Sequence, residues 1–94
     1  MKISCKVKVK NPQGLHARPA SAIVRILQES CCEVYFTCRK EKVNARSIMS
    51  LLTLAASKNS TIFIEMEGED AELTLAKIVK AFESQFNEGI SNLT

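Results

Sequence analysis

The chain has 94 residues, of which 46% are hydrophobic and 5% aromatic, and its formal net charge is +3 at pH 7. This length suits one domain with a small core, and the mild charge with few aromatic side chains argues against a nucleic-acid-binding protein. The N-terminal residues alternate charged and apolar side chains and no apolar run reaches membrane-spanning length, so we expect a cytoplasmic protein without membrane insertion.

The first expected element is a strand over residues 2–10. Ile3, Cys5, Val7 and Val9 alternate there with polar side chains, most of them lysines. A period of two predicts a strand with one face in the core and the other in solvent.

The next segment holds the only histidine of the chain. His16 follows a loop over residues 11–14 and stands where a helix should begin, because Pro19 fits the first helical turn. The positive end of the helix dipole favours neutral imidazole, which is a nucleophile. A phosphoryl group on it would meet the backbone N–H groups of Ala17 and Arg18, and the guanidinium of Arg18 could pair with its oxygens. The alternative is a plain helix cap or a surface histidine.

The segment around this histidine is distinctive as a whole. Its seven residues, Gly14-Leu15-His16-Ala17-Arg18-Pro19-Ala20, closely resemble the active-site segment of the HPr family of phosphocarriers, which serve the phosphoenolpyruvate-dependent phosphotransferase system. The resemblance implies a phosphohistidine at His16, with Arg18 stabilising the phosphate charge. It also implies enzyme I as donor and the A domain of an enzyme II as acceptor. We therefore expect a phosphoryl carrier, not a stand-alone enzyme, with no cofactor and no metal.

The middle of the chain alternates short elements. The first helix should end near residues 28–30, and residues 32–38 indicate a second strand. Residues 39–42 are expected to form a charged hairpin turn, after which Val43 begins a short third strand. A second helix is expected over residues 47–56. Its buried face should hold Ile48, Leu51, Leu52 and Ala55, which leaves Met49 on the opposite side.

Ser47 has two expected roles at the start of this helix. As the cap it would accept a backbone N–H bond. In addition, residues 43–49 resemble the family segment that carries a regulatory serine phosphorylated by an ATP-dependent kinase. The resemblance makes Ser47 a candidate phosphorylation site and an HPr serine kinase/phosphorylase a candidate partner.

The surface around the first two helices is expected to dock partner proteins through a small, transient interface. Leu15, Met49 and Leu52 would contribute to it if exposed. Ser50 and Ala55 stand where many sugar-transport members have glycine, and this helix is somewhat closer to the nitrogen-related branch called NPr. The alternative function is an NPr-type regulatory phosphoprotein that acts by phosphorylation-dependent binding. A third hypothesis is a non-catalytic binding module of the same fold, in which His16 is never phosphorylated.

The four cysteines show no Cys-x-x-Cys spacing, so neither a disulfide framework nor a zinc site is expected. Cys5 and Cys38 occupy apolar positions of predicted strands and should lie in the core. Cys31 and Cys32 should form a junction between loop and strand, where a redox role of the adjacent pair stays open.

The last two elements are a strand over residues 61–67 and a long amphipathic helix. Asp70 is expected to cap this helix, and Gly89 to end it. Its apolar stripe consists of Ala71, Leu75, Ile78, Val79, Phe82 and Phe86.

These elements together predict an α+β domain in the order βαββαβα. One-sided alternation in the strands and one-sided stripes in the helices imply a four-stranded antiparallel sheet with three helices on one face. This agrees with the open-faced β-sandwich that the resemblance to the HPr family implies. We expect a single domain over residues 1–88, a short tail over 89–94, and a monomer.

Overall fold

The computed structural model describes residues 1–87, which form four strands, three α-helices and one short 3-10 helix in the expected order. The elements are β1 Lys2–Lys8, α1 Ala17–Gln28, β2 Glu33–Cys38, β3 Glu41–Asn44, α2 Ile48–Leu54, β4 Thr61–Glu67, α3 Ala71–Glu83 and η1 Gln85–Asn87. The strands form one antiparallel sheet in the order β1-β4-β2-β3. The predicted α+β class and βαββαβα order are thus confirmed. The predicted tail and the predicted helix end at Gly89 lie outside the described residues.

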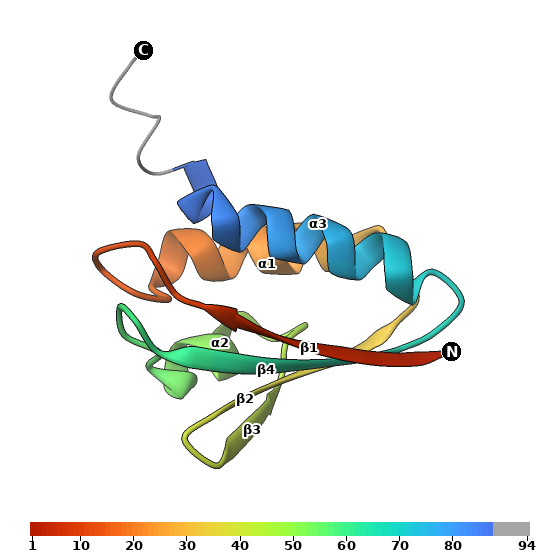
Figure 1. Ribbon diagram of the computed structural model, residues 1–94, viewed down its shortest axis with the longest axis horizontal. Helices are drawn as coiled ribbons and strands as arrows, with labels where there is room; N and C mark the ends of the chain where they lie inside the picture. Colours follow the sequence, from red (N-terminus) through yellow and green to blue (C-terminus); the bar gives the residue numbers. More distant parts are fainter. Residues whose placement is uncertain (88–94) are drawn as a thin grey trace.

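The core lies between the sheet and the helices. Along β2 and β4 the residues facing this core are fully buried, whereas Tyr35 and Phe63, which alternate with them, stay partly exposed. Helices α1 and α3 run side by side along the sheet (Figure 1). The strands therefore bury one face only, as their alternation predicts.

Strand β1 lies at the edge of the sheet and is two residues shorter than expected. Its inward side chains Ile3, Cys5 and Val7 are only partly buried, because β1 has a neighbouring strand on one side alone. Val9 lies beyond the end of the strand but is fully buried, and its N–H donates to the carbonyl of Ser60 at 2.9 Å.

The turn between β2 and β3 is shorter than predicted. Arg39 and Lys40 have φ values of +53° and +71°, which is the backbone of a two-residue hairpin turn. Glu41 and Lys42, predicted as turn residues, belong to β3 instead. Lys42 forms a salt bridge with Glu65 on β4, with Nζ 3.3 Å from Oε1.

The buried face of helix α2 matches the predicted one only in part. Leu51 and Leu54 point into the core, while Ile48 is 38% exposed and Leu52 is half-buried. The helix also ends at Leu54, because Ala55 takes up a left-handed conformation with φ of +52°. This turn exposes Ala55 and buries Ala56.

Ala55 occupies a backbone conformation that favours glycine, and this leads to a stability prediction. Ala55→Gly is expected to raise the free energy of unfolding by about 1 kcal/mol, because glycine lacks the Cβ that is strained in left-handed backbone. Urea denaturation measures the change. The control is Ala76→Gly at an exposed position within α3, which should lower stability by about 0.5–1 kcal/mol. A loss of stability in both variants would contradict the prediction.

Helix α3 ends before the predicted position. It stops at Glu83, and Gln85 and Phe86 follow with φ of +55° and +54°. This reversal brings the Phe86 ring against Phe82, at 4.9 Å between the ring centroids. Phe86 therefore joins the apolar core as predicted, but from a turn and not from the helix.

Candidate functional site

The loop before α1 holds His16 at the N-cap of this helix. Gly14 has φ of +71°, and a Cβ at this position would overlap the carbonyl oxygen of Ala56. Leu15 N–H donates to the same carbonyl oxygen at 2.8 Å, and the buried Asn11 donates from Nδ2 to the carbonyl oxygen of Gly14. The backbone immediately before the histidine is therefore fixed from two sides.

His16 is the N-cap residue of α1, as the sequence predicts. Its backbone is extended, with φ of −91° and ψ of −164°, and its carbonyl accepts the N–H of Ala20 at 3.0 Å. The His16 side chain is partly buried, and it does not form a capping bond to the helix. An extended N-cap followed by the N–H groups of the first turn is the geometry that binds phosphate at helix ends.

The first turn of α1 offers positive potential without a competing acid. The residues of this turn are all described, and none of them is acidic. Ala17 and Arg18 are both exposed, so an incoming phosphoryl group could reach their backbone N–H groups and the Arg18 guanidinium. Pro19 is buried and occupies the early position that the sequence assigned to it. These features can stabilise a dianion next to the imidazole.

The three expected docking residues differ in how exposed they are in the structure. Leu15 is only 4% exposed, so it is a core residue and we correct its predicted place on the surface. Met49 is 70% exposed, as required of a docking residue, and Leu52 is half-buried. Ile48, which the sequence placed in the core, adds a further exposed apolar side chain beside Met49.

Helices α1 and α2 run in opposite directions, which places Ser47 away from His16. Ala56, just after α2, bonds to Leu15 before α1, whereas Arg46 before α2 bonds to Leu27 near the end of α1. The structure therefore groups His16 with Ala17 and Arg18 and sets Ser47 toward the other end of the helix pair.

Ser47 caps α2 as the sequence predicts. Its Oγ accepts the backbone N–H of Ser50 at 3.2 Å. Ser47→Ala is expected to lower the free energy of unfolding by about 1 kcal/mol, because this N–H loses its acceptor. Urea denaturation measures the loss, with Ser47→Thr as the variant that keeps the hydroxyl and most of the stability. Equal losses in both variants would show that the hydroxyl is not the stabilising group.

Arg46 forms a clamp that sequence reasoning missed. Its guanidinium donates to the carbonyl oxygens of Leu27 (2.7 Å), Ser30 (2.6 Å) and Cys32 (2.7 and 3.0 Å). The carbonyls at a helix C-terminus lack partners within the helix, and a cation there also balances the negative end of the dipole. Arg46 thus ties the end of α1 and the start of β2 to the segment that begins α2. No local sequence pattern predicts these hydrogen bonds, because the partners of Arg46 lie 14 to 19 residues away in the chain.

A polar cluster joins the same end of α1 to the start of α3. Cys32 Sγ donates to Asp70 Oδ1 at 2.8 Å, and Ser30 Oγ donates to the same oxygen at 3.2 Å. The Cys32 bond is the largest of the effects that lower the pKa of Asp70, while burial followed by the Asp70 contact raises the pKa of Cys32. Asp70 is the N-cap residue of α3 as expected, but its side chain forms no capping hydrogen bond to the helix, and its Oδ1 atom accepts from Cys32 and Ser30 instead.

The two adjacent cysteines have different environments. Cys32 is 1% exposed, whereas Cys31 is on the surface, so the pair does not present two thiols side by side. We expect iodoacetamide at neutral pH to alkylate Cys31 first, since a buried thiol with a raised pKa reacts slowly. Peptide mass mapping over time checks the order, and urea-unfolded protein serves as the control with similar rates at both positions. Equal labelling of Cys31 and Cys32 in folded protein would contradict the assignment.

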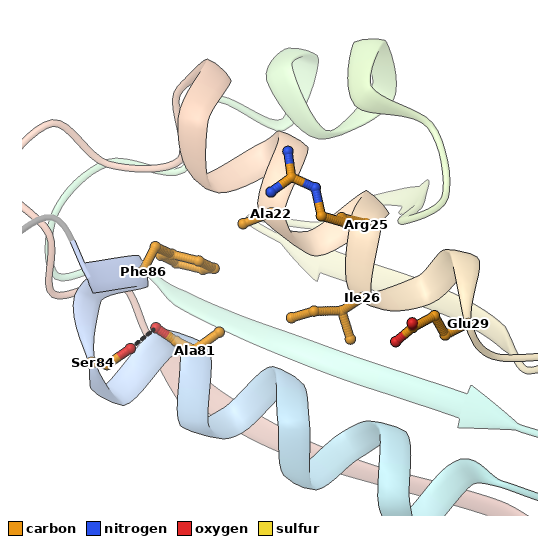
Figure 2. Close-up of a pocket in the computed structure, with 7 residues that line it drawn as sticks. All are labelled: Ala22, Arg25, Ile26, Glu29, Ala81, Ser84 and Phe86. Atoms are coloured by element: carbon orange, nitrogen blue, oxygen red, sulfur yellow. Dashed lines mark hydrogen bonds between the residues drawn. The ribbon is translucent and has the colours of Figure 1, made fainter.

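For the described part of the chain, three other features are relevant to function: a metal site, a membrane-spanning helix and a hollow near the predicted site residues. Residues 1–87 contain no group of three or more metal-ligating side chains and no helix long and apolar enough to cross a membrane. A hollow of about 360 Å³ lies between α1 and α3, where Ile26 and Phe86 point into the gap between the helices (Figure 2). None of the predicted site residues lines this hollow.

Comparisons with a family model, with related sequences and with solved structures all find similarity to the same family. A family model described as the PTS HPr component phosphorylation site matches residues 3–84. Phosphocarrier protein HPr from Chlamydia muridarum is 40% identical over 86 residues, which cover 92% of this chain and 83% of that protein. HPr from Chlamydia pneumoniae is 42% identical over 80 residues, covering 85% and 74%. The crystal structure of an HPr from Thermoanaerobacter tengcongensis has a TM-score of 0.87 at 32% identity, covering 92% of this chain and 97% of that chain.

Proposed function

This chain belongs to the HPr family of phosphocarriers of the phosphoenolpyruvate-dependent phosphotransferase system, and we propose that His16 is the residue that carries the phosphoryl group. The family implies phospho-enzyme I as the donor and the A domain of an enzyme II as the acceptor. The carrier acts as a monomer in the cytoplasm, where phosphoenolpyruvate is available.

The arrangement at the start of α1 supports this assignment most strongly. His16 stands at the N-cap of a helix whose first turn carries exposed Arg18 and no acidic residue. In the proposed transfer, the lone pair of the His16 Nδ1 atom forms a bond to phosphorus while the bond to the donor histidine breaks. The donor ring leaves as neutral imidazole because its other nitrogen carries a proton, and the His16 ring keeps its own proton on Nε2. The backbone N–H groups of Ala17 and Arg18 stabilise the phosphoryl oxygens together with the guanidinium.

Intact mass tests this function directly. Incubation with phosphoenolpyruvate and a purified enzyme I is expected to add one phosphoryl group, which mild acid removes because a phosphoramidate is acid-labile. A known carrier shows in parallel that the enzyme I is active. The proposal fails if that control is phosphorylated and this chain, with enzyme I from its own source, is not.

The relatives named above favour the phosphocarrier function over the nitrogen-related alternative. They are called phosphocarrier protein HPr. Transfer from the phosphorylated protein to a sugar-specific A domain, compared with transfer to a nitrogen-type A domain, distinguishes the two branches. We expect the sugar-specific domain to accept the phosphoryl group faster.

Ser47 is a second proposed phosphorylation site, with a regulatory function. Its hydroxyl already lies at the positive end of α2, where a phosphate would be stabilised by the helix dipole. The exposed side chains of Ile48 and Met49 follow directly and would contact docked partners. A dianion beside this apolar surface would weaken docking by desolvation cost. Incubation with ATP and an HPr kinase should give an acid-stable phosphate that is absent from Ser47→Ala.

A further inference from the structure

An open hollow lies between the β2–β3 hairpin and the loop that precedes β4. Its volume is about 360 Å³, and residues 38–39 and 57–61 line it. None of these residues is acidic, and none belongs to the proposed phosphoryl-transfer site. Arg39 and Lys58 give the lining two cationic side chains.

The guanidinium of Arg39 is oriented by neutral groups. Its Nη2 atom donates to Ser57 Oγ at 3.1 Å and to Ser60 Oγ at 3.2 Å. Hydroxyl acceptors fix the guanidinium plane but do not neutralise its charge. Because both bonds use Nη2, the Nη1 and Nε donors of the same planar group remain for a ligand.

The two hydroxyls are held by a well-bonded loop. Ser57 Oγ and Ser60 Oγ lie 3.2 Å apart, and Ser60 N–H donates to the Ser57 carbonyl at 3.0 Å. The loop is also joined to Val9, through Asn59 N–H to the Val9 carbonyl (2.7 Å) and Val9 N–H to the Ser60 carbonyl (2.9 Å). Donors that are already ordered lose little conformational entropy when a ligand binds.

The chemistry of the lining selects an anion with several oxygen acceptors. A planar guanidinium matches phosphate oxygens better than an ammonium does. Lys58 adds a further donor, as does the one serine O–H that the bond between Ser57 Oγ and Ser60 Oγ leaves over. We propose that this hollow, which we call the Arg39 site, binds the phosphate group of a small phosphorylated molecule. The proposal does not depend on the function of His16.

Titration with inorganic phosphate and with glycerol 3-phosphate at constant ionic strength tests the Arg39 site. We expect saturable changes in the amide NMR shifts of residues 38–40 and 57–61. Arg39→Gln should weaken this binding at least about tenfold, which is typical for the loss of hydrogen bonds to a charged group. Arg25→Gln removes an exposed arginine of α1 and should leave binding at the Arg39 site unchanged. His16→Ala should also leave it unchanged, which separates this test from that of the phosphocarrier function.

Each result has a defined meaning. Tighter binding of glycerol 3-phosphate assigns the site to organic phosphates, and equal binding assigns it to inorganic phosphate. The proposal is overturned if sodium chloride alone reproduces the shifts, or if Arg39→Gln and Arg25→Gln weaken them equally. Thermal unfolding of Arg39→Gln confirms that the variant is folded before either conclusion is drawn.

Discussion

His16→Ala is expected to abolish the acid-labile phosphate that enzyme I and phosphoenolpyruvate add to this protein. The residue is the only histidine in the chain, so no other side chain can form a phosphohistidine. It also occupies the N-cap of α1, where the N–H groups of the first turn would bind the transferred group. Intact mass before and after mild acid measures the loss.

Substitution of Arg18 tests the same phosphoryl transfer, with a smaller expected loss of rate. Arg18→Gln keeps the histidine but removes the cation from the first turn of α1, and we expect transfer to slow by about 10²-fold. The control is Arg25→Gln, which removes an equal charge from the last turn of the same helix. If both arginine variants slow transfer equally, net charge and not local stabilisation explains the effect. Acid-labile phosphate on His16→Ala would refute the assignment of His16.

Arg46→Met is expected to cause the largest loss of stability, about 2–4 kcal/mol in the free energy of unfolding. Methionine fills similar space but leaves the carbonyl oxygens of Leu27, Ser30 and Cys32 without their charged donor. The Leu27 carbonyl keeps the Ser30 N–H at 3.0 Å, but all three carbonyls lose a charged donor. This loss is costly at partly buried acceptors, because water replaces the bond incompletely. Urea denaturation monitored by far-UV circular dichroism gives the difference.

Two further variants make the Arg46 prediction specific. Arg25→Met changes an exposed arginine near the end of α1 and should alter stability by no more than about 0.5 kcal/mol. Arg46→Lys keeps the charge but lacks the planar group of donors, so we expect an intermediate loss. A loss in Arg46→Lys as small as in Arg25→Met would mean that charge alone explains the effect of Arg46.

The candidate site was predictable because its parts are adjacent in the sequence. His16, Ala17, Arg18 and Pro19 are consecutive, and a helix start brings such neighbours together without help from distant residues. The cap at Ser47 was predictable for the same reason, since its partner Ser50 is three residues away. One-sided alternation likewise predicted correctly that β2 and β4 bury a single face.

The wrong predictions share a different cause. Asp70 has the residue type of a helix cap, but Cys32 and Ser30, 38 and 40 residues away, engage its carboxylate. Ile48 has the spacing of a core residue, but the packing of α2 leaves it 38% exposed and buries Leu54 beside the correctly predicted Leu51. In both cases a local preference is overridden by tertiary contacts that local sequence does not encode.

The sequence by itself determined the order of the elements, the fold class and the residues at the start of α1, because periodicity and capping act over a few residues. The tertiary structure alone decided which surfaces are exposed and which distant groups meet. It buried Leu15, exposed Ile48, and joined Arg46 to α1 and Arg39 to the loop before β4. These outcomes depend on how complete elements pack against one another, so they appear only when the whole chain has folded.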